Sequence, residues 1–529
     1  MKIVLLQPPI RDFYETDIRL QPLGLCYLKA TIQKHFSSVR VIVKDYHAGW
    51  GRRTLPWPRE LTYLKPYYGK ADKSPFCTFH HFYHFGADYE TIARDLKKES
   101  PDLIGISSLF TAYYQEVLET ASAIKREIQV PIFAGGSHAS ALPETLLAHP
   151  AIDFVIRGEG ERAIVKFLKQ WQRKADSLSS KKKLVPSPTR NFPVDKIPFP
   201  DFSDLSQSHY LYEGKPLCFI LTSRGCPYHC SFCSVHETFG HQYRRRSNDN
   251  ILREIQLRYE QGYRVFDLED DNLTFDKKAA CLLFKKIILL FPKNDLQFLA
   301  MNGICYWHLD HELLSLMRQA GFTHLNLSLV SSNPSVCQTA RRPLDLKKYR
   351  SVIEDAFRLG FKIVSYQILG LPGETEHSMA RTLILHAKLP VLIGASPFYV
   401  APGKANEPPP STVNTRLTGL LAWRTPKQRD SVYTFFVITR ILNFLKGISL
   451  QGDSSLKTAL RVARKSGKRS AAGVKILEML LEGRGLHGWS HDSFELQPRF
   501  RTEHFYKVWR KIDRIATQEG RSIILKGKL

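Results

Sequence analysis

The chain has 529 residues, a length that suggests roughly three to four domains. Hydrophobic residues make up 43% of it, as in ordinary globular cores, and no run of about 18 uncharged apolar residues predicts a membrane-spanning helix. The 76 lysines and arginines outnumber the 50 acidic residues, so the chain is strongly basic. No export signal is expected, because Pro8 and Pro9 interrupt the first apolar run, and cysteines without such a signal indicate the cytoplasm.

Residues 1–173 alternate strand and helix signals, the pattern of a parallel, doubly wound sheet. Such sheets bind ligands at the carboxyl ends of their strands. We expect strands at Ile3–Gln7, Val39–Lys44, Leu103–Ser107, Pro131–Ala134 and Phe154–Ile156, and helices at Pro22–Phe36, Tyr89–Lys98, Tyr114–Ile128 and Glu161–Trp171. The range therefore predicts an α/β, Rossmann-like domain.

The turns that follow these strands hold the candidate binding residues of the first domain. Gln-Pro-Pro follows the first strand, a serine pair and a glycine pair close two later ones, and Gly-Glu-Gly-Glu follows the last. Glycine at such turns lets the backbone approach a large ligand closely. The candidates are Gln7, Pro8, Ser107, Ser108, Gly135, Gly136, Gly158 and Glu159.

The segment from Trp50 to Gly86 interrupts the alternation and is rich in aromatic residues. We expect either an insertion packed against a neighbouring domain or a wall of the ligand cleft. A metal site built from its histidines is the weaker alternative. Residues 174–215 are typical of a linker, polar and basic at first and then stiffened by five prolines.

Three cysteines in residues 216–402 carry the strongest signal in the chain. Cys226, Cys230 and Cys233 are spaced C-x3-C-x2-C and follow the apolar run Leu217–Leu221, so they lie on a loop that leaves a strand. A [4Fe–4S] cluster normally takes four thiolates, so three leave one iron open to a small molecule. Zinc usually takes two cysteine pairs, and a second C-x2-C pair is missing. Nine cysteines without an export signal also disfavour disulfides.

This motif resembles the signature of the radical S-adenosylmethionine (SAM) enzymes. The resemblance implies a partial (β/α)6 barrel in which the three cysteines hold the cluster and the open iron chelates SAM. Loops at the carboxyl ends of the barrel strands would supply the other contacts. By resemblance, these cofactor-binding residues are Phe232, Asp270, Asp271, Asn272, Ser328, Gln367, Gly370 and Gly373.

Four further features of this block bear on the same family. The turn Gly370–Thr375 matches its G-x-P-G-E-T motif, and the segment from Ser396 to Gly403 resembles the closing strand of its cobalamin-dependent subgroup. Val330-Ser331 stands where many relatives have a glutamate, which puts a ribose contact in doubt. The arginines at 244–246 precede a helix that Ser247 would cap, and they form either a solvated charge run or a contact for the SAM carboxylate.

The turns of the first domain, in this order and ahead of such a motif, resemble a cobalamin-binding domain. Corrinoid methyltransferases carry D-x-H-x-x-G after the first strand, where the histidine ligates cobalt, but Gln7-Pro8-Pro9 stands at that position here. The similar segment Asp45–Gly49 follows the second strand instead. We therefore interpret His47 as a turn or interface residue and expect cobalamin to bind without a protein histidine ligand.

Residues 403–529 are expected to form a basic, mainly helical domain. The helices are predicted at Val432–Lys446, Leu456–Lys465, Val474–Leu481 and Tyr506–Ala516. From residue 404 onward there are 24 basic and 10 acidic residues, which contribute +14 to the total charge of +26. Such a surface suits an anionic substrate, an acidic electron donor, nucleic acid or an anionic membrane, or it is merely a soluble basic surface.

The combined resemblance covers roughly residues 1–402 and implies a cobalamin-dependent radical SAM enzyme. Its reduced [4Fe–4S] cluster would cleave SAM, and methylcobalamin would methylate an unactivated carbon of a small-molecule or lipid-like substrate. A flavodoxin- or ferredoxin-like protein would supply the electron. The closest alternative is a cyclase or oxidase with the same cofactors and no methyl transfer, and a sensor or nucleic-acid binder is the more distant one.

Overall fold

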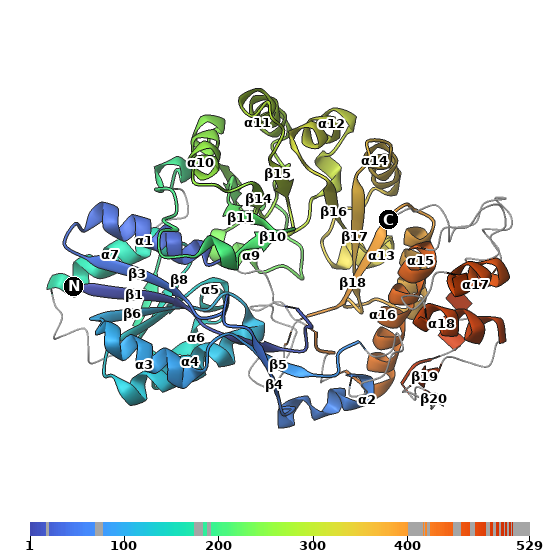
Figure 1. The fold of residues 1–529 in the computed structure, drawn as a ribbon, viewed down its shortest axis with the longest axis horizontal. Helices are drawn as coiled ribbons and strands as arrows, with labels where there is room; N and C mark the ends of the chain where they lie inside the picture. The colour runs from blue at the N-terminus through green and yellow to red at the C-terminus, as the bar shows by residue number, and fades with distance from the viewer. Residues whose placement is uncertain are drawn as a thin grey trace.

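The computed structural model describes most of the chain and places two α/β units beside a helical block (Figure 1). The expected segment Pro402-Gly403, Cys77 and most of the helix expected at 506–516 lie outside the described residues. The described residues are 1–16, 21–68, 78–173, 183–187, 192–399, 416, 418–420, 424–447, 456–465, 471–482, 487–489, 494–496, 499–501, 503–504, 507–508 and 510–511.

The N-terminal unit is a six-stranded parallel sheet in the order β3-β1-β6-β7-β8-β9, so the expected doubly wound sheet is confirmed. Ile3 and Leu5 of β1 pack under one helical layer, and Val4 and Leu6 pack under the other. Helices cover both faces, so the central strands are mainly apolar. The strands are β1 (Lys2–Gln7), β3 (Arg40–Asp45), β6 (Leu103–Ser107), β7 (Ile132–Gly135), β8 (Phe154–Arg157) and β9 (Lys183–Pro186), with α1 (Leu23–His35) and α7 (Gly160–Arg173) on one face and α3 (Tyr89–Glu99) and α4 (Tyr114–Glu127) on the other.

Six more parallel strands, with helices along their outer side, form the expected partial (β/α)6 barrel, seen as the arc in Figure 1. They form two hydrogen-bonded groups, β11-β14-β15 and β16-β17-β18, which isolated bridges such as Phe298–Phe322 join. The strands are β11 (Lys215–Ile220), β14 (Val265–Leu268), β15 (Gln297–Leu299), β16 (His324–Val330), β17 (Lys362–Leu369) and β18 (Leu392–Pro397), and the helices are α10 (Asn248–Glu260), α11 (Lys277–Leu290), α12 (His311–Ala320), α14 (Leu346–Arg358) and α15 (Glu376–Ala387).

Polar caps fix where several of these helices begin. Ser247 accepts a hydrogen bond from Asn250 N at the start of α10, as predicted. Asp276 does the same for α11, and Thr375 forms a capping box at the start of α15. Each cap satisfies backbone N–H groups that have no partner inside the first helical turn.

The aromatic insertion packs against the C-terminal helical block, which agrees with the first of the two expected alternatives. Its side chains Tyr67 and Tyr68 share a core with Tyr433 and Ile438. Tyr67 OH also donates to Asp430 Oδ1 at 2.7 Å. The elements involved are the antiparallel sheet β2 (Ile10–Asp12), β5 (Phe82–Phe85) and β4 (Arg52–Leu55), the helices η1 (Arg59–Leu64) and α2 (Lys65–Tyr68), and α16 (Pro426–Gly447).

The described residues of the C-terminal block include three of the four helices that its sequence predicts, and most of the fourth lies outside them. These are α16, α17 (Leu456–Lys465) and α18 (Ala471–Glu482), followed by a hairpin of β19 (His487–Trp489) and β20 (Phe494–Leu496). Within the described ranges, every helix is too short or too polar to cross a membrane. The anionic partner expected for this basic block stays a prediction.

Candidate active site

The loop that carries the three cysteines is closed at its base by a short pair of strands. β12 (Ser223–Arg224) pairs with β13 (Arg244–Arg245) in antiparallel fashion, so the residues between them form one loop beyond β11. Gly225 opens this loop with φ at +80°, and a Cβ there would lie 2.5 Å from Gln242 O. Only glycine fits such a position. The loop also contains the short helix α9 (Val235–Phe239).

Cys226, Cys230 and Cys233 lie on this loop as free thiols, with Cys230 buried and the other two half-buried. Burial raises the pKa of the Cys226 thiol, and it raises the pKa of Cys233 to about 11. The thiols of Cys226 and Cys233 are therefore protonated at neutral pH until a metal binds them. Asn272 Nδ2 donates to Cys226 Sγ at 3.7 Å, and Arg342 Nη1 donates to Cys230 Sγ at 3.6 Å.

This set of ligands and donors fits a [4Fe–4S] cluster. Hydrogen bonds to the sulfurs are among the features that set a cluster's reduction potential. Across the described residues, no three Cys, His, Asp or Glu side chains lie close enough to hold a single metal ion. A cluster of four irons is larger than one ion, so its ligands lie farther apart. The same finding disfavours a metal site among the described histidines of the insertion.

Arg342 is a site residue that sequence reasoning missed. Its Nη2 donates to Ser328 O at 2.9 Å, and its guanidinium carbon lies 4.9 Å from the centre of the Trp307 ring. Together with the bond to Cys230, these contacts hold the cation beside the expected cluster. Arg342 follows the short helix α13 (Pro334–Thr339), far from the cysteine motif in sequence. It belongs to none of the motifs from which the site was predicted.

The acidic loop after β14 braces the cysteine loop. The Asp270 carboxylate accepts from Thr222 N at 3.1 Å and from the hydroxyls of Thr222 and Ser223. Asp271 accepts from Gly225 N at 2.9 Å, and burial raises the pKa of this carboxyl to about 6. Both oxygens of Asp270 therefore accept hydrogen bonds from the protein, and its expected contact with SAM stays a prediction.

Asn272, next to these aspartates, is better placed to meet a ligand. Asn272 Oδ1 is buried and has no hydrogen-bond partner among the described residues, so a donor such as an ammonium would satisfy it. Glu269 accepts from Asn302 Nδ2 at 2.7 Å. Burial, followed by the charge of Asp267, raises the pKa of Glu269 to about 8. The residues of this loop thus fit the polar end of SAM.

Phe232 lies in an apolar cluster with Val330, Val336, Leu371 and Phe398. Val330 has φ at +74°, a genuine outlier for a β-branched residue. The register of β16 against β17 shifts just before it. Strain of this kind collects at functional sites. Val330 stands where the family resemblance implies a glutamate, and here it lies in an apolar cluster.

The G-x-P-G-E-T turn is held by its own glutamate. Glu374 accepts from Gly370 N at 2.7 Å and Leu371 N at 3.2 Å, and Ser331 Oγ donates to it at 3.4 Å. Burial raises the pKa of this carboxyl to about 7. A Cβ at Gly370 would lie 2.5 Å from Arg424 Nη1, so a helical-block residue closes the turn.

Gln367 is not brought to the candidate site. It is buried on the face of β17 that packs against α15, where its Nε2 donates to Met379 O at 3.4 Å. Tyr366 lies on the opposite face and meets Ser328 beside Gly303. Gly373, with φ at +77°, has open space around its Cβ position. Of these two neighbours, Tyr366 is therefore the one beside Ser328, and a cofactor contact by Gln367 stays a prediction.

The turns after β6 and β7 form one tight backbone unit. Ser108 N donates to Gly135 O at 2.6 Å, and His138 N donates to Ser108 O at 3.1 Å. Gly136 has φ at +123°, and a Cβ there would lie 2.5 Å from Ser108 O. Ser107 ends β6 and is half-buried, whereas Ser108 Oγ is buried without a partner among the described residues. This glycine-lined edge with an unsatisfied hydroxyl fits a large polar ligand such as cobalamin.

The residues after β1 and β3 lie at the same edge of the sheet. Gln7 and Pro8 are buried there, and the residues directly after β1 include no histidine. His47 is also buried, and its backbone N donates to Asp45 Oδ1 at 2.7 Å. Asp45 accepts from Tyr210 OH, a residue of the segment that leads into the barrel. His47 thus occupies a turn at an interface, as we interpreted it.

His138 is fully engaged inside the N-terminal unit. Its Nδ1 lies 3.1 Å from Thr111 Oγ1 and its Nε2 lies 2.9 Å from Thr145 Oγ1. Burial lowers the pKa of this imidazole to about 4, so it is neutral at physiological pH. With both nitrogens in hydrogen bonds, the ring supports the turn after Gly136.

Gly158 and Glu159 lie at the joint between the two α/β units. Gly158 N donates to Ser140 Oγ at 2.9 Å. The Glu159 carboxylate accepts from Arg224 Nη1 at 2.9 Å and also from Arg244, and both arginines belong to the base of the cysteine loop. Both oxygens of Glu159 therefore bind arginines of the barrel, and its expected contact with a cofactor stays a prediction.

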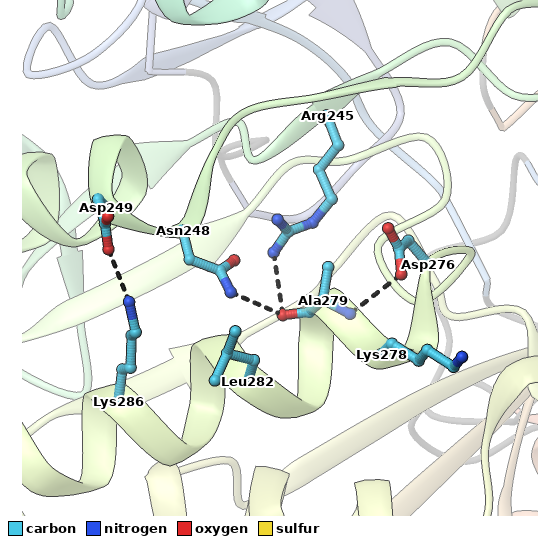
Figure 2. Close-up of a pocket in the computed structure, with 8 residues that line it drawn as sticks. All are labelled: Arg245, Asn248, Asp249, Asp276, Lys278, Ala279, Leu282 and Lys286. Atoms are coloured by element: carbon cyan, nitrogen blue, oxygen red, sulfur yellow. Dashed lines mark hydrogen bonds and ion pairs between the residues drawn. The ribbon is translucent and has the colours of Figure 1, made fainter.

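Two of the three arginines at 244–246 are buried in ion pairs. Arg244 pairs with Glu159, and buried Arg246 pairs with Glu254, so neither is solvated or free for a SAM carboxylate. Arg245 donates to Ala279 O at 3.4 Å, in a surface groove of about 550 Å³ between α10 and α11 (Figure 2). None of the cysteines or expected cofactor residues lines this groove.

Comparisons with known proteins identify the two α/β units. Residues 220–385 match the radical SAM superfamily and residues 78–168 match the B12 binding domain. One relative is cytidylyl-2-hydroxyethylphosphonate methyltransferase of Streptomyces wedmorensis, 27% identical over 416 residues, or 70% of this chain and 73% of the relative. Another is the anaerobic magnesium-protoporphyrin IX monomethyl ester cyclase of Cereibacter sphaeroides, 26% identical over 364 residues, or 64% and 58%.

Solved structures agree with this assignment of the fold. The radical SAM methyltransferase TsrM of Kitasatospora setae, with cobalamin and a [4Fe–4S] cluster bound, matches with a TM-score of 0.56 at 17% identity, over 85% of this chain and 76% of that one. The cobalamin-dependent radical enzyme OxsB with aqua-cobalamin matches with a TM-score of 0.57 at 11% identity, over 98% and 80%. The chain therefore contains a radical SAM domain and a B12 binding domain, which imply a [4Fe–4S] cluster, SAM and cobalamin as cofactors.

Proposed function

We propose that this enzyme transfers a methyl group from SAM, by way of cobalamin, to an unactivated carbon of an organic substrate. The joint between the two α/β units carries the proposal. The turn after β8 contacts the base of the cysteine loop through Glu159 and Arg224, 2.9 Å apart, and Arg157 contacts Glu237 of α9 at 3.2 Å. This joint supports a cavity shared by both cofactors, which methyl transfer to a carbon radical requires.

The proposed roles of the residues follow from their contacts. Cys226, Cys230 and Cys233 would hold the cluster, and Asn272 would accept a hydrogen bond from the SAM ammonium. When bound, the cofactors supply reductive cleavage of SAM and a transferable methyl group. The apolar cluster around Phe232 would exclude water, which protects a reactive radical from side reactions.

A second candidate function keeps these cofactors but transfers no methyl group. The similarity to a magnesium-protoporphyrin IX monomethyl ester cyclase favours it, because the alignment with that relative covers 64% of this chain. The alignment with the methyltransferase relative is longer, because it covers 70% of this chain at a similar identity. We therefore place methyl transfer first and ring formation or oxidation second.

Turnover of the reconstituted full chain distinguishes the two. Under anaerobic conditions with a reductant, methyl-labelled SAM and extract of the source cells, we expect label in one product and accumulation of both 5′-deoxyadenosine and S-adenosylhomocysteine. The variant lacking all three cysteines is the control and should form none of these. Formation of 5′-deoxyadenosine without product labelling would establish the cyclase-type reaction, and no SAM cleavage at all would refute both.

A further inference from the structure

Buried charges that the proposed chemistry does not use hold the two α/β units together. Arg224 donates to Glu159 at 2.9 Å and to Glu161 at 2.5 Å, and Arg244 donates to the second oxygen of Glu159. The four side chains are only 4–10% exposed. Charges this deep are tolerated only when they are paired, so each depends on the others.

The arginines of this joint stand at the base of the cysteine loop. Arg224 lies two residues before Cys226, and Arg244 is its direct partner in the β12–β13 pair. Glu159 therefore contacts both strands from which the loop emerges. The guanidinium of Arg224 also lies 5.3 Å from the centre of the Tyr27 ring in the N-terminal unit. Arg224 is thus fixed from the N-terminal unit while it belongs to the barrel.

The glutamate side of the joint is connected to the glycine-lined edge expected to bind cobalamin. Ser140 Oγ donates to Gly136 O at 2.8 Å and accepts from Gly158 N at 2.9 Å. Gly158 immediately precedes Glu159. The short helix α5 (Ser137–Ala141), which carries Ser140, packs against α9 of the cysteine loop. A continuous set of hydrogen bonds therefore leads from Gly136 to the residue two before Cys226.

We infer that Glu159 is a positioning residue that fixes the cysteine loop, and hence the cluster, relative to the cobalamin edge. This inference rests on the proposed function, because it gives the joint a role in bringing two cofactors together. In Glu159→Gln, the buried Arg224 and Arg244 would lose the carboxylate that they share. Glu161 would still pair with Arg224, so the loop would stay folded but lose its fixed placement.

The decisive measurement is the distance between the two cofactors. Pulsed electron paramagnetic resonance on the anaerobic full-length holoenzyme gives the separation of cob(II)alamin and the reduced cluster. We expect a narrow distribution in the wild type and a broadened or shifted one in Glu159→Gln, with the cluster g-values altered. The ratio of 5′-deoxyadenosine to final product should rise severalfold, and Glu159→Asp should restore part of the wild-type distribution.

Glu116→Gln is the matched control, because Glu116 is also buried and shared by two arginines. It accepts from Arg11 at 2.8 Å and from Arg416 at 2.7 Å, and it makes no contact with the cysteine loop. This variant should lose stability but keep the wild-type distance and g-values. Equal distances in Glu159→Gln and the wild type would overturn the inference, as would an equal change in both variants.

Hydrogen exchange of the cofactor-free full chain separates this inference from the proposed function. We expect the segment 225–243 to exchange at least about tenfold faster in Glu159→Gln than in Glu116→Gln, because removing one partner of a buried ion pair is strongly destabilising locally. An unchanged exchange rate of this segment in Glu159→Gln would refute the inference about Glu159, whether or not the cofactors bind as proposed. If Glu159→Gln does not fold, Glu159→Asp takes its place in both measurements. Failure of the wild type to bind either cofactor would instead refute the proposed function.

Discussion

Removal of the Arg342 cation should make the cluster harder to reduce. The guanidinium donates to Cys230 Sγ at 3.6 Å and is held in place by Ser328 O and the Trp307 ring. Reduction adds negative charge to the cluster and its thiolates, which a nearby cation stabilises. Arg342→Met removes that cation and leaves a side chain of similar length. The reduction potential should therefore become more negative.

The size of the shift follows from the hydrogen bond. A bond from a charged donor contributes about 1.5–3 kcal/mol. For a one-electron couple a tenfold change in equilibrium corresponds to about 59 mV, so the full bond corresponds to roughly 65–130 mV. Arg342 contacts sulfur at 3.6 Å and is half-buried, so we expect the lower part of that range. Arg342→Lys keeps the charge and should shift the potential by less.

Potentiometric titration of the reconstituted full chain, followed by the paramagnetic resonance of the reduced cluster, measures this shift. Arg341→Met serves as the control, because Arg341 is the exposed neighbour and its loss should leave the potential unchanged. An unchanged potential in Arg342→Met with a fully loaded cluster would refute the assignment of Arg342 to the cluster environment. So would an equal shift in Arg341→Met.

Three further predictions follow from the site. Replacing Cys226, Cys230 and Cys233 together by alanine should abolish the visible absorption of the cluster and reductive SAM cleavage, and a full cluster in that variant after anaerobic reconstitution would refute the ligand assignment. Cobalamin should bind base-off and without a protein histidine ligand, because no histidine lies directly after β1, so the cob(II)alamin form should show no nitrogen superhyperfine splitting. A splitting that disappears in His47→Ala would contradict this. Burial lowers the pKa of His138 from 6.5 to about 4. Between pH 6.5 and 4 the unfolded chain therefore takes up a proton at this residue, whereas the folded chain does not. The free energy of unfolding should fall by at most about 3 kcal/mol as the pH drops through this window. Thermal melts against pH should show a flatter dependence in His138→Gln than in a variant of the exposed His311, and equal slopes would contradict the assignment.

The secondary structure of this chain was largely predictable, because each element carries its own local signal. β1 and β6 are runs of apolar residues, and α10 begins at the expected cap Ser247. The cysteine motif was equally easy to recognise, because its three cysteines lie within a few residues of one another on one loop. Features that depend on neighbours in sequence were therefore accessible without a structure.

Only the tertiary structure decided which side chains face the site. β17 packs on both of its faces, so apolar patterning does not reveal that Tyr366, and not Gln367, lies beside Ser328. Glu159 and Asp270 were chosen as polar residues after strands, yet each is engaged by groups more than 45 residues away in sequence. Arg342 reaches Cys230 across 112 positions. The sequence by itself determined the local elements and the spacing of the three cysteines, whereas the partners of buried charges depend on which distant segments the fold brings together.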